Sequence, residues 1–578
     1  MSIILGLNAF HAGASAALII DGKTEFAIAE ERLNRVKYYA GFPVKAIEAC
    51  LEYAGIDFSQ IDHVAIGRDS SANRQQKLQY VIKNPLLLPN LLKIKSARKS
   101  LGDLRQLLTE ECGIPAGKLK FKEHHIEHHL AHTASAFFMS GWDEAAGITI
   151  DGSGDFVTCM MSQCKGREIK PIHRIYVPAS LGSFYTMVCQ FVGYVKYGDE
   201  GKVMGLAPLG KDAYREDFLD MISFEDGAIK LNPKYFMPFG SDQGMSINEQ
   251  GQMVINRHYT DYMIERFGQP RVPHAELTQR DMDLAFGMQH RFEEIYFDLL
   301  NYLHAKVPNE KVAMAGGCAL NSVANGKVFD NTPFTDTFIQ PAAGDEGLAI
   351  GAAIYVAHSL LGEGKNERLE TSYFGGGVNE EKIEASLKRE GIKYNRLDRD
   401  ELLKQTADEI VQGKVIGWFQ GRSEWGPRAL GNRSILCHPG FEGMKDILNA
   451  RIKHREWFRP FAPVVLEERQ NDIFEHDFPS PFMLHVYKIR EEWREKLSAV
   501  NHVDDTGRLQ TLTRDQNSMY YDLIKAFEAK TGIPVLLNTS FNENEPIVET
   551  HDEAIDCYLR TKMDVLVAGP FICRKTQS

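Results

Sequence analysis

Five of the nineteen histidines of this chain lie within nine residues, in the segment 123–138 (EHHIEHHLAHTASAFF). The segment is rich in Glu, Leu and Ala and contains neither Pro nor Gly, so the sequence predicts a helix over 123–138. A His-x3-His pair on one helical face can present two imidazole nitrogens to one metal ion. The alternative is that these histidines form a solvent-exposed polar face of the helix and bind no metal. On such a helix, three histidines share one face and two form a neighbouring pair: His124, His128 and His132, then His125 and His129.

Two aspartates elsewhere in the chain could complete a metal site. Asp151 ends the predicted strand GITID (147–151), and Asp345 lies in a Gly-rich turn between a strand and an Ala-rich helix in 338–357. In a doubly wound sheet, ligands gather at the carboxyl ends of strands. Two imidazoles and two carboxylates suit Fe(II), Zn(II) or Mn(II). We expect the other three histidines around the ligands or on the surface. The predicted ligands are His128, His132, Asp151 and Asp345.

The segments around these residues form two similar runs of predicted elements. Each run is a strand, a polar Gly-containing turn, a second strand, a tight turn and a third strand. Two copies of one plan indicate a duplicated unit, the pattern of actin-like ATPases, which hold a nucleotide between Gly-rich hairpin turns. His11 lies in the Gly-containing turn of the first run. The predicted strands are 3–7, 15–20 and 24–32 in the first run and 147–151, 156–163 and 167–175 in the second.

Two further Gly-rich segments could approach a ligand with their backbone amides. Segment 193–210 (GYVKYGDEGKVMGLAPLG) has five glycines and no clear periodicity, so we expect a loop there. Segment 311–327 is predicted to be a strand, a turn at Gly316 and Gly317, and the start of a helix. That order suits a phosphate or ribose at a helix N-terminus.

The composition bounds the class of protein and its surroundings. A chain of 578 residues is too long for one core, and 43% hydrophobic with 25% charged residues is typical of a globular enzyme. A net charge of −12 argues against a protein whose whole surface binds nucleic acid or anionic lipid. Nine cysteines without a Cys-x2-Cys pair indicate free thiols. We see no signal peptide or membrane span, and we therefore expect a cytoplasmic protein.

The Lys- and Leu-rich stretch 77–105 is expected to be an amphipathic surface insertion. A nucleic-acid arm is the less favoured alternative, because the basic residues alternate with leucines at helical spacing. We consider the stretch a lid on the acceptor side of the protein. A homodimer is the expectation from general frequencies of oligomers.

The chain changes character after a polar, Gly-rich linker at 359–380. From Arg422 to Arg459 the sequence has eight Lys or Arg residues but only four Asp or Glu residues. The basic residues are interspersed with Trp, Phe, Gly and Pro. Such interleaving indicates ordered arginines in a shaped pocket, which a phosphate or carbamoyl-phosphate group requires. Further downstream, His502 and Arg508 lie in NHVDDTGRLQ, and an apolar strand runs into Asn-Thr-Ser at 538–540, which can present hydroxyls and amides to a phosphate.

These motifs together resemble the O-carbamoyltransferases of nodulation-factor, cephamycin and aminoglycoside biosynthesis. The resemblance rests on GKVMGLAP, GGCALN, GDEGLAIGAA, WGPRALGNRSIL, KHREWFRPFAPV and LNTSFN, in this order over nearly the whole chain. It implies two fused α/β modules. Residues 1–365 would form an actin-like module similar to the enzyme that threonylcarbamoylates tRNA, and residues 371–578 a module similar to YrdC-type carbamoyl-adenylate formers.

The resemblance also implies a reaction with two steps. The second module would form carbamoyl adenylate and pyrophosphate from carbamoyl phosphate and ATP with Mg(II). In the first, a metal, with Fe(II) favoured, would polarise the mixed anhydride while His11 deprotonates a hydroxyl of a small-molecule acceptor. Gly316, Gly317 and Asn321 would contact the nucleotide. Carbamoyl phosphate and ATP would be bound by Arg428, Lys453, Arg455, Arg459, His502, Arg508, Asn538 and Ser540.

This chain departs from the family pattern directly after its candidate base. Family members often have Asp after this histidine, whereas the turn here reads His11-Ala12-Gly13. A carboxylate that orients His11 must therefore come from another part of the chain. The alternative is a turn histidine with a structural hydrogen bond.

Two other classes of function compete with an ATP-dependent O-carbamoyltransferase. A tRNA threonylcarbamoyl-transferring enzyme would share the metal helix, but the acidic charge and the WGPRALGNRS motif disfavour it; tight, salt-sensitive binding of tRNA would favour it. A nucleotide-switched actin-like binding protein would need neither the metal ligands nor the arginine-rich second pocket.

Overall fold

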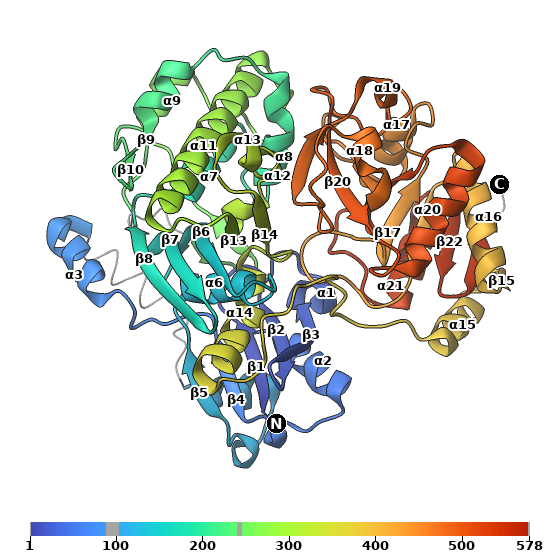
Figure 1. Cartoon of the computed structure of the whole chain (residues 1–578), viewed down its shortest axis with the longest axis horizontal. Helices are drawn as coiled ribbons and strands as arrows, with labels where there is room; N and C mark the ends of the chain where they lie inside the picture. The colour runs from blue at the N-terminus through green and yellow to red at the C-terminus, as the bar shows by residue number, and fades with distance from the viewer. Residues whose placement is uncertain (1, 88–102, 240–244, 576–578) are drawn as a thin grey trace. The chain divides into compact units, whose positions relative to one another are not determined.

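The computed structural model describes residues 2–87, 103–239 and 245–575, and the chain divides into two compact units (Figure 1). The first unit comprises Met1–Asn321 and Lys327–Leu369, and the second comprises Ser322–Gly326 and Glu370–Ser578. Residues 88–102 of the expected insertion at 77–105 lie outside the described residues. Before them the chain forms helix α3 (Arg74–Lys83).

The first unit contains two five-stranded sheets with the same order of strands. In each sheet, three antiparallel strands that follow one another in sequence are extended by two parallel strands. One sheet, in spatial order, is β3 (Lys23–Ala29), β2 (Ser15–Ile20), β1 (Ile3–Asn8), β4 (His63–Ile66) and β5 (Lys122–His125). The other is β8 (Glu168–Tyr176), β7 (Val157–Lys165), β6 (Glu144–Gly154), β13 (Lys311–Ala315) and β14 (Asp336–Ile339). The predicted duplicated α/β unit of actin-like topology is confirmed.

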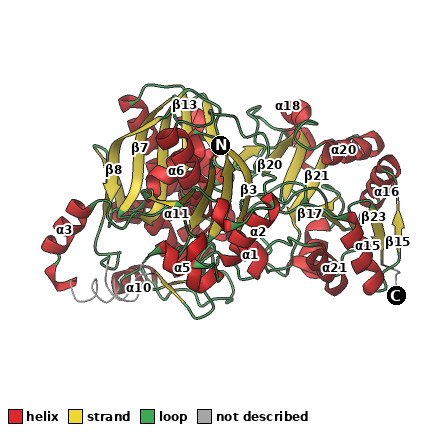
Figure 2. Cartoon of the chain, turned by 90° about the horizontal axis from the view of Figure 1, so that it is seen from below, coloured by secondary structure: helices red, strands yellow, loops and turns green. Residues whose placement is uncertain are grey.

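Two helices that are rich in small residues pack between the two sheets of the first unit. Helix α14 (Leu348–Tyr355) packs against β1 and against helix α6 (His128–Phe137). Helix α6 in turn lies against the second sheet (Figure 2). A Cβ atom on Gly351 of α14 would lie 2.0 Å from the carbonyl oxygen of Ala131 in α6. The sequence therefore permits a backbone contact that places α6 and the start of α14 close together.

The predicted helix over 123–138 is wrong in its first part. His124 and His125 belong to strand β5, which pairs with β4 in parallel register, and helix α6 starts only at His128. Glu127 caps the helix, because its carboxylate accepts the Leu130 N–H at 2.8 Å. Strand pairing and this cap outweigh the helix propensity of the segment, so His124 does not share a face with the other two histidines.

Two smaller predictions also need correction. The segment 193–210 is not a loop throughout, because it contains helix α8 (Glu200–Leu206). The expected strand 24–32 ends at Ala29, and helix α1 (Glu30–Asn34) follows it. In both places the helix is only five or seven residues long, so its sequence does not repeat often enough to show a helical period.

The second unit is built on a nine-stranded mixed sheet. Helices α16 (Arg399–Val411) and α20 (Ser518–Thr531) pack together over it. Strand β19 forms one edge, which the short segment Ser322–Gly326 covers: the Asn325 side chain donates to the Leu484 carbonyl at 3.0 Å. In spatial order the strands are β15 (Tyr394–Arg396), β23 (Phe571–Arg574), β22 (Val565–Ala568), β16 (Ile416–Phe419), β17 (Arg433–Cys437), β21 (Val535–Ser540), β18 (Ala462–Leu466), β20 (Thr506–Leu512) and β19 (His485–Lys488).

None of the helices within the described residues is long and apolar enough to cross a lipid bilayer.

Candidate active site

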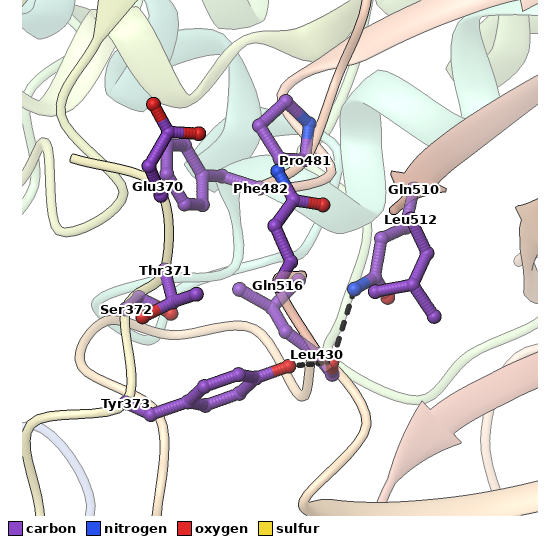
Figure 3. Close-up of a pocket in the computed structure, with 10 residues that line it drawn as sticks. All are labelled: Glu370, Thr371, Ser372, Tyr373, Leu430, Pro481, Phe482, Gln510, Leu512 and Gln516. Atoms are coloured by element: carbon purple, nitrogen blue, oxygen red, sulfur yellow. Dashed lines mark hydrogen bonds between the residues drawn. The ribbon is translucent and has the colours of Figure 1, made fainter. Parts of the chain in front are cut away.

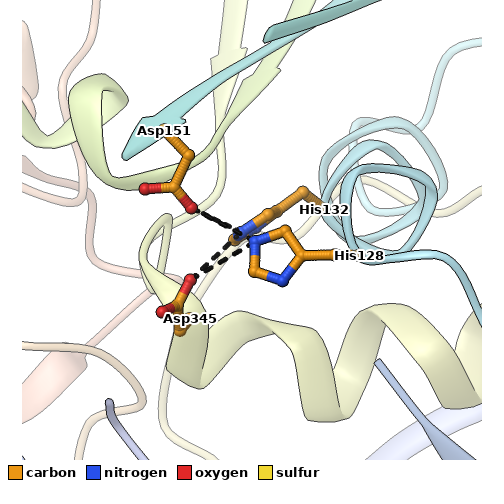
Figure 4. A group of neighbouring side chains, drawn as sticks. All are labelled: His128, His132, Asp151 and Asp345. Carbon is orange, nitrogen blue, oxygen red and sulfur yellow. Dashed lines mark hydrogen bonds and ion pairs between the residues drawn. The ribbon is translucent and has the colours of Figure 1, made fainter. Parts of the chain in front are cut away.

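Four side chains from three parts of the first unit converge on one point (Figure 4). His128 and His132 come from successive turns of α6, Asp151 from β6, and Asp345 from the turn after β14. The regular pairing of β6 with β7 breaks after Ile150, which turns Asp151 out of the ladder. One ligand atom from each residue lies within 4.8 Å of the others. The structure thus brings together the four predicted ligands.

The spacing of these atoms can be compared with that of a metal site. Oδ2 of Asp151 lies 3.2 Å from Nε2 of His128 and 3.4 Å from Nε2 of His132, and Oδ1 of Asp345 lies 3.6 and 3.5 Å from the same nitrogens. Ligands about 2.0–2.2 Å from a tetrahedral ion are about 3.3–3.6 Å apart. In addition, Nε2 of His132 and Oδ1 of Asp345 are buried without a hydrogen bond within the described residues. The donor set therefore fits a divalent metal ion.

The charges of the cluster also suit a cation. Burial opposes protonation of His132, but the neighbouring carboxylates of Asp151 and Asp345 outweigh burial and raise its pKa to about 9. Burial alone would raise the pKa of Asp345, but His11 and His132 lower it to about 2. Both carboxylates therefore stay ionised at neutral pH, and a bound cation would replace the proton on His132.

His11 joins this cluster through Asp345. Its Nδ1 lies 2.5 Å from Oδ2 of Asp345, the carboxylate oxygen that does not face the two helix histidines. The side chain of Asn8 holds the turn by donating to the carbonyls of Ala12 and Gly13 at 3.1 and 3.0 Å. The His11 side chain remains 29% exposed. A carboxylate from a distant part of the chain, that of Asp345, thus contacts His11, which has no Asp directly after it in the sequence.

Of the three residues predicted to contact the nucleotide, two lie next to the histidine and aspartate cluster and one does not. Gly316 has a φ of +91°, and a Cβ there would lie 2.4 Å from the carbonyl oxygen of Ile150. A Cβ on Gly317 would lie 3.0 Å from Oδ1 of Asp151, so the Gly-Gly turn is next to the cluster. Asn321 is directed elsewhere: its side chain exchanges two hydrogen bonds with Gln289 of helix α11 (Gln279–Lys306).

In the second unit, the other three predicted anion-binding arginines lie around Arg508. Burial first, and then the charges of Arg428, Arg459 and Arg455, hold the pKa of Arg508 well below its usual range. Its buried Nε has no hydrogen-bond partner among the described residues. Burial and Arg459 also lower the pKa of Arg455 to about 9. These four guanidinium groups are only partly exposed and repel one another, so an anion bound among them would reduce the repulsion.

The other predicted residues of this unit make internal hydrogen bonds. Nζ of Lys453 donates to the carbonyls of Ser540 and Asn542 at 2.6 and 2.7 Å. Nδ2 of Asn538 donates to the Ala429 carbonyl at 3.2 Å, and Nε2 of His502 lies 3.1 Å from the Phe458 carbonyl oxygen. These contacts tie the end of β21 and the loop after β16 to the arginines.

Sequence reasoning missed Asp155, which holds the start of helix α6 in place. Its Oδ2 accepts the backbone N–H of His128 at 3.0 Å and that of Asp69 at 2.8 Å. Asp155 adopts a φ of +47° in the turn between β6 and β7. The GSGD turn was visible in the sequence, but only the tertiary structure brings it to the start of α6.

The histidines that were not predicted as ligands have three different environments. His124 shares a hydrogen bond of 2.9 Å with His63, and His125 is exposed beside Glu123. His129 is buried behind the cluster, where its ring bonds the Thr149 hydroxyl and the Val157 carbonyl oxygen. These placements agree with an outer or surface position for all three.

The fold and the site are those of an α/β protein with a duplicated first unit and a buried cluster of two histidines and two carboxylates. Comparison with known proteins identifies the family. Residues 3–354 match the family model "Carbamoyltransferase N-terminus" and residues 407–575 match "Carbamoyltransferase C-terminus". The chain belongs to the carbamoyltransferase family, and the protein is a carbamoyltransferase, which confirms the resemblance in its motifs.

Two relatives and one solved structure illustrate these similarities. The chain is 38% identical to an uncharacterized protein of Synechocystis sp. over 100% of this chain and 97% of that protein. It is 37% identical to nodulation protein NolNO of Sinorhizobium fredii over 98% of this chain and 80% of the relative. Full-length HypF in the phosphate- and nucleotide-bound form aligns with a TM-score of 0.30 and 14% identity, over 62% of this chain and 56% of that one.

Proposed function

We propose that this carbamoyltransferase is ATP-dependent and transfers a carbamoyl group to a hydroxyl of a small-molecule acceptor. The observation that carries the proposal is the carboxylate of Asp345. One of its oxygens lies beside His132, within a set of side chains that could bind a metal ion, and the other forms a hydrogen bond with the partly exposed His11. A base and an electrophile-binding centre are what carbamoyl transfer to an alcohol requires. Because ATP is a substrate, we place the protein in the cytoplasm.

The first half-reaction is assigned to the second unit. Carbamoyl phosphate would lose phosphate to water and give carbamate, whose oxygen attacks the α-phosphorus of ATP. Carbamoyl adenylate forms and pyrophosphate leaves. The arginines around Arg508 bind the anionic groups, and Mg(II) accompanies ATP. Lys453 and Asn538 support these arginines by fixing the adjacent loops.

The second half-reaction is assigned to the first unit. His128, His132, Asp151 and Asp345 would hold a divalent metal, with Fe(II) favoured over Zn(II) or Mn(II) by the family resemblance. When bound, the metal supplies Lewis acidity toward the carbamoyl carbonyl. With Nδ1–H of His11 donated to Asp345, its Nε2 can accept the proton of the acceptor hydroxyl as that oxygen attacks the carbonyl carbon and AMP leaves. The backbone of Gly316 and Gly317 lies where the AMP phosphate can approach it.

A two-stage assay tests this proposal. The purified protein is incubated with ATP and carbamoyl phosphate, and pyrophosphate is measured without an acceptor. A panel of hydroxylated metabolites is then added, and products heavier by one carbamoyl group are sought by mass spectrometry. We expect carbamoyl-phosphate-dependent pyrophosphate release and at least one carbamoylated alcohol. No pyrophosphate release from a folded, metal-loaded protein would refute the adenylate route.

A further inference from the structure

A small pocket in the second unit lies beside Ser372, and it is too small for a substrate. Leu430, Phe482 and Leu512 supply apolar side chains to its walls (Figure 3). Its free space is about that of one water molecule, so the pocket cannot hold a metabolite. A side chain that could contact a substrate lies in the first unit instead, near the turn of His11.

The segment 38–41 packs along the turn that carries His11. On either side of His11, the N–H groups of Phe10 and Ala14 donate to backbone carbonyls of this segment at 3.1 and 2.8 Å. Asp345 contacts the same turn, because its Oδ2 lies 2.5 Å from Nδ1 of His11. The turn therefore contacts both the histidine and aspartate cluster and the segment 38–41.

The aromatic ring of Tyr197 packs against Tyr38, the first residue of that segment. The two ring centroids are 5.4 Å apart, and the angle between the ring planes is 67°. Gly198 permits this approach, because its φ is +82° and a Cβ on it would lie 2.2 Å from the phenol of Tyr38. Tyr197 is thereby held near the turn of the candidate base.

Asp199 closes the loop that carries Tyr197. The carboxylate of Asp199 uses both of its oxygens: Oδ2 accepts the Lys196 N–H at 3.1 Å, and Oδ1 lies 2.8 Å from Nζ of Lys202. Asp199 is buried, with 8% of the residue exposed. Charge-assisted hydrogen bonds of this kind hold a loop in one geometry, so contacts within the protein fix the backbone of Tyr197.

The hydroxyl of Tyr197 makes no hydrogen bond within the described residues, although the residue is partly buried. Burial raises the pKa of Tyr197 well above its usual range, and the nearby charges of Asp345 and Asp151 raise it further. The hydroxyl is thus near both carboxylates of the cluster. A phenol is protonated at neutral pH even without such a shift. Tyr197 can therefore donate a hydrogen bond to a group that binds at the cluster.

We propose that Tyr197 is a further catalytic residue, whose hydroxyl donates a hydrogen bond to the carbonyl oxygen of the carbamoyl group. The assignment rests on the proposed transfer to an acceptor hydroxyl in the first unit. As the acceptor oxygen attacks the carbonyl carbon, an electron pair of the C=O bond moves onto the carbonyl oxygen, and the hydrogen bond strengthens. The C=O bond forms again when AMP leaves. Tyr197 keeps its proton throughout, and the proton of the acceptor goes to Nε2 of His11.

Tyr197→Phe removes this hydrogen bond and keeps an aromatic ring against Tyr38. We expect the single-turnover rate of carbamoyl transfer, measured with an alcohol that the wild-type protein carbamoylates, to fall about 10- to 100-fold. Carbamoyl-phosphate-dependent pyrophosphate release and the metal content should be unchanged, because the hydroxyl is assigned to neither. A general loss of structure would lower all three quantities, so a selective loss of transfer separates catalysis from stability.

The matched control is Tyr235→Phe, which removes the hydroxyl of another tyrosine of the first unit, one that donates to Asp220 at 3.1 Å. It should leave the transfer rate unchanged. Replacing Tyr197 with 3-fluorotyrosine decides the question if Tyr197→Phe does not fold, because the phenol becomes more acidic at nearly the same size. This stronger donor should raise the transfer rate.

Two results overturn the role of Tyr197: a Tyr197→Phe protein that transfers at the wild-type rate, or an unchanged rate with 3-fluorotyrosine. A Tyr197→Phe protein that loses pyrophosphate release together with transfer also overturns it. If the wild-type protein carbamoylates no alcohol, the proposed function itself is overturned, and the role of Tyr197 with it.

Discussion

Asp345 is the residue on which the two parts of the first site depend. Its Oδ1 lies among the nitrogens of His128 and His132, while its Oδ2 bonds Nδ1 of His11. A hydrogen bond to Nδ1 sets the tautomer of an imidazole and leaves Nε2 as the acceptor. In the proposed function, this one carboxylate would both orient His11 as the base and contribute to the metal site, so the turn would not need an Asp in place of Ala12 after His11.

Replacing a metal ligand should separate the two half-reactions. We expect His132→Ala to abolish carbamoyl transfer and to lower the metal content below half of the wild-type value. Pyrophosphate release should stay within about threefold, because it is assigned to the other unit. Metal analysis and the two-stage assay measure these effects, and His125→Ala, at an exposed position, is the control. Loss of both half-reactions in a folded His132→Ala protein would contradict the division of labour.

Arg508 should show a conflict between function and stability. Because burial and three neighbouring cations oppose its charge, Arg508→Gln should raise the melting temperature, by about 2–4 °C for each kcal/mol gained. The same change should reduce kcat/KM for carbamoyl phosphate at least 100-fold, since an anion loses its central donor. Calorimetry and pyrophosphate release test the two effects. Arg399→Gln, which alters an exposed pair with Asp522, should change neither by much. A destabilised Arg508→Gln protein would argue against repulsion within the cluster.

At the scale of elements, the start of helix α6 decides which histidines can be ligands. The histidine-rich segment has the composition of one helix, but strand β5 takes its first residues and Glu127 caps the helix after them. Asp155, from the neighbouring hairpin, then accepts the N–H of His128. The i, i+4 pair His128 and His132 could be predicted from local spacing. The exclusion of His124 could not, because it follows from the pairing of β5 with a strand about 60 residues earlier in the chain.

The contact between α6 and α14 offers a test at this scale. Gly351→Ala should destabilise the protein by about 1–3 kcal/mol and lower its metal affinity, because the added methyl group would meet the Ala131 carbonyl oxygen. Gly201→Ala is the matched control in helix α8, where no atom lies within 4 Å of the added Cβ. It should stabilise the protein by about 0.5–1 kcal/mol. Equal effects of the two substitutions on denaturant unfolding would contradict the close helix contact.

At the scale of the whole molecule, the second unit is not continuous in sequence. Ser322–Gly326 belongs to it although the chain on either side belongs to the first unit. This short segment covers the edge strand β19, and a Cβ on Gly326 would lie 2.0 Å from the Val486 carbonyl oxygen. Val486 is the register partner of Arg508, so the covered edge supports the strand that carries the central arginine.

A fragment that begins at Glu370 should therefore be a poor version of the second unit. We expect it to unfold at a lower temperature than the same unit in the full chain and to associate at its exposed edge. Light scattering and calorimetry measure these properties. Within the full chain, Asn325→Ala should reproduce part of the destabilisation, because it removes the hydrogen bond to the Leu484 carbonyl. A monomeric fragment as stable as the unit in the full chain would show that the segment is dispensable.

By itself, the sequence determined the features that depend on local pattern and motif order. The duplicated strand runs, the spacing of His128 and His132, and the ordered motifs of the family could all be recognised from neighbouring residues. Only the tertiary structure decided how distant residues meet. It bonds His11 to Asp345, leaves Arg508 among three other arginines, and turns Asn321 toward Gln289. These contacts join positions that are tens to hundreds of residues apart, so they depend on sheet register and packing rather than on the local periodicity of the chain.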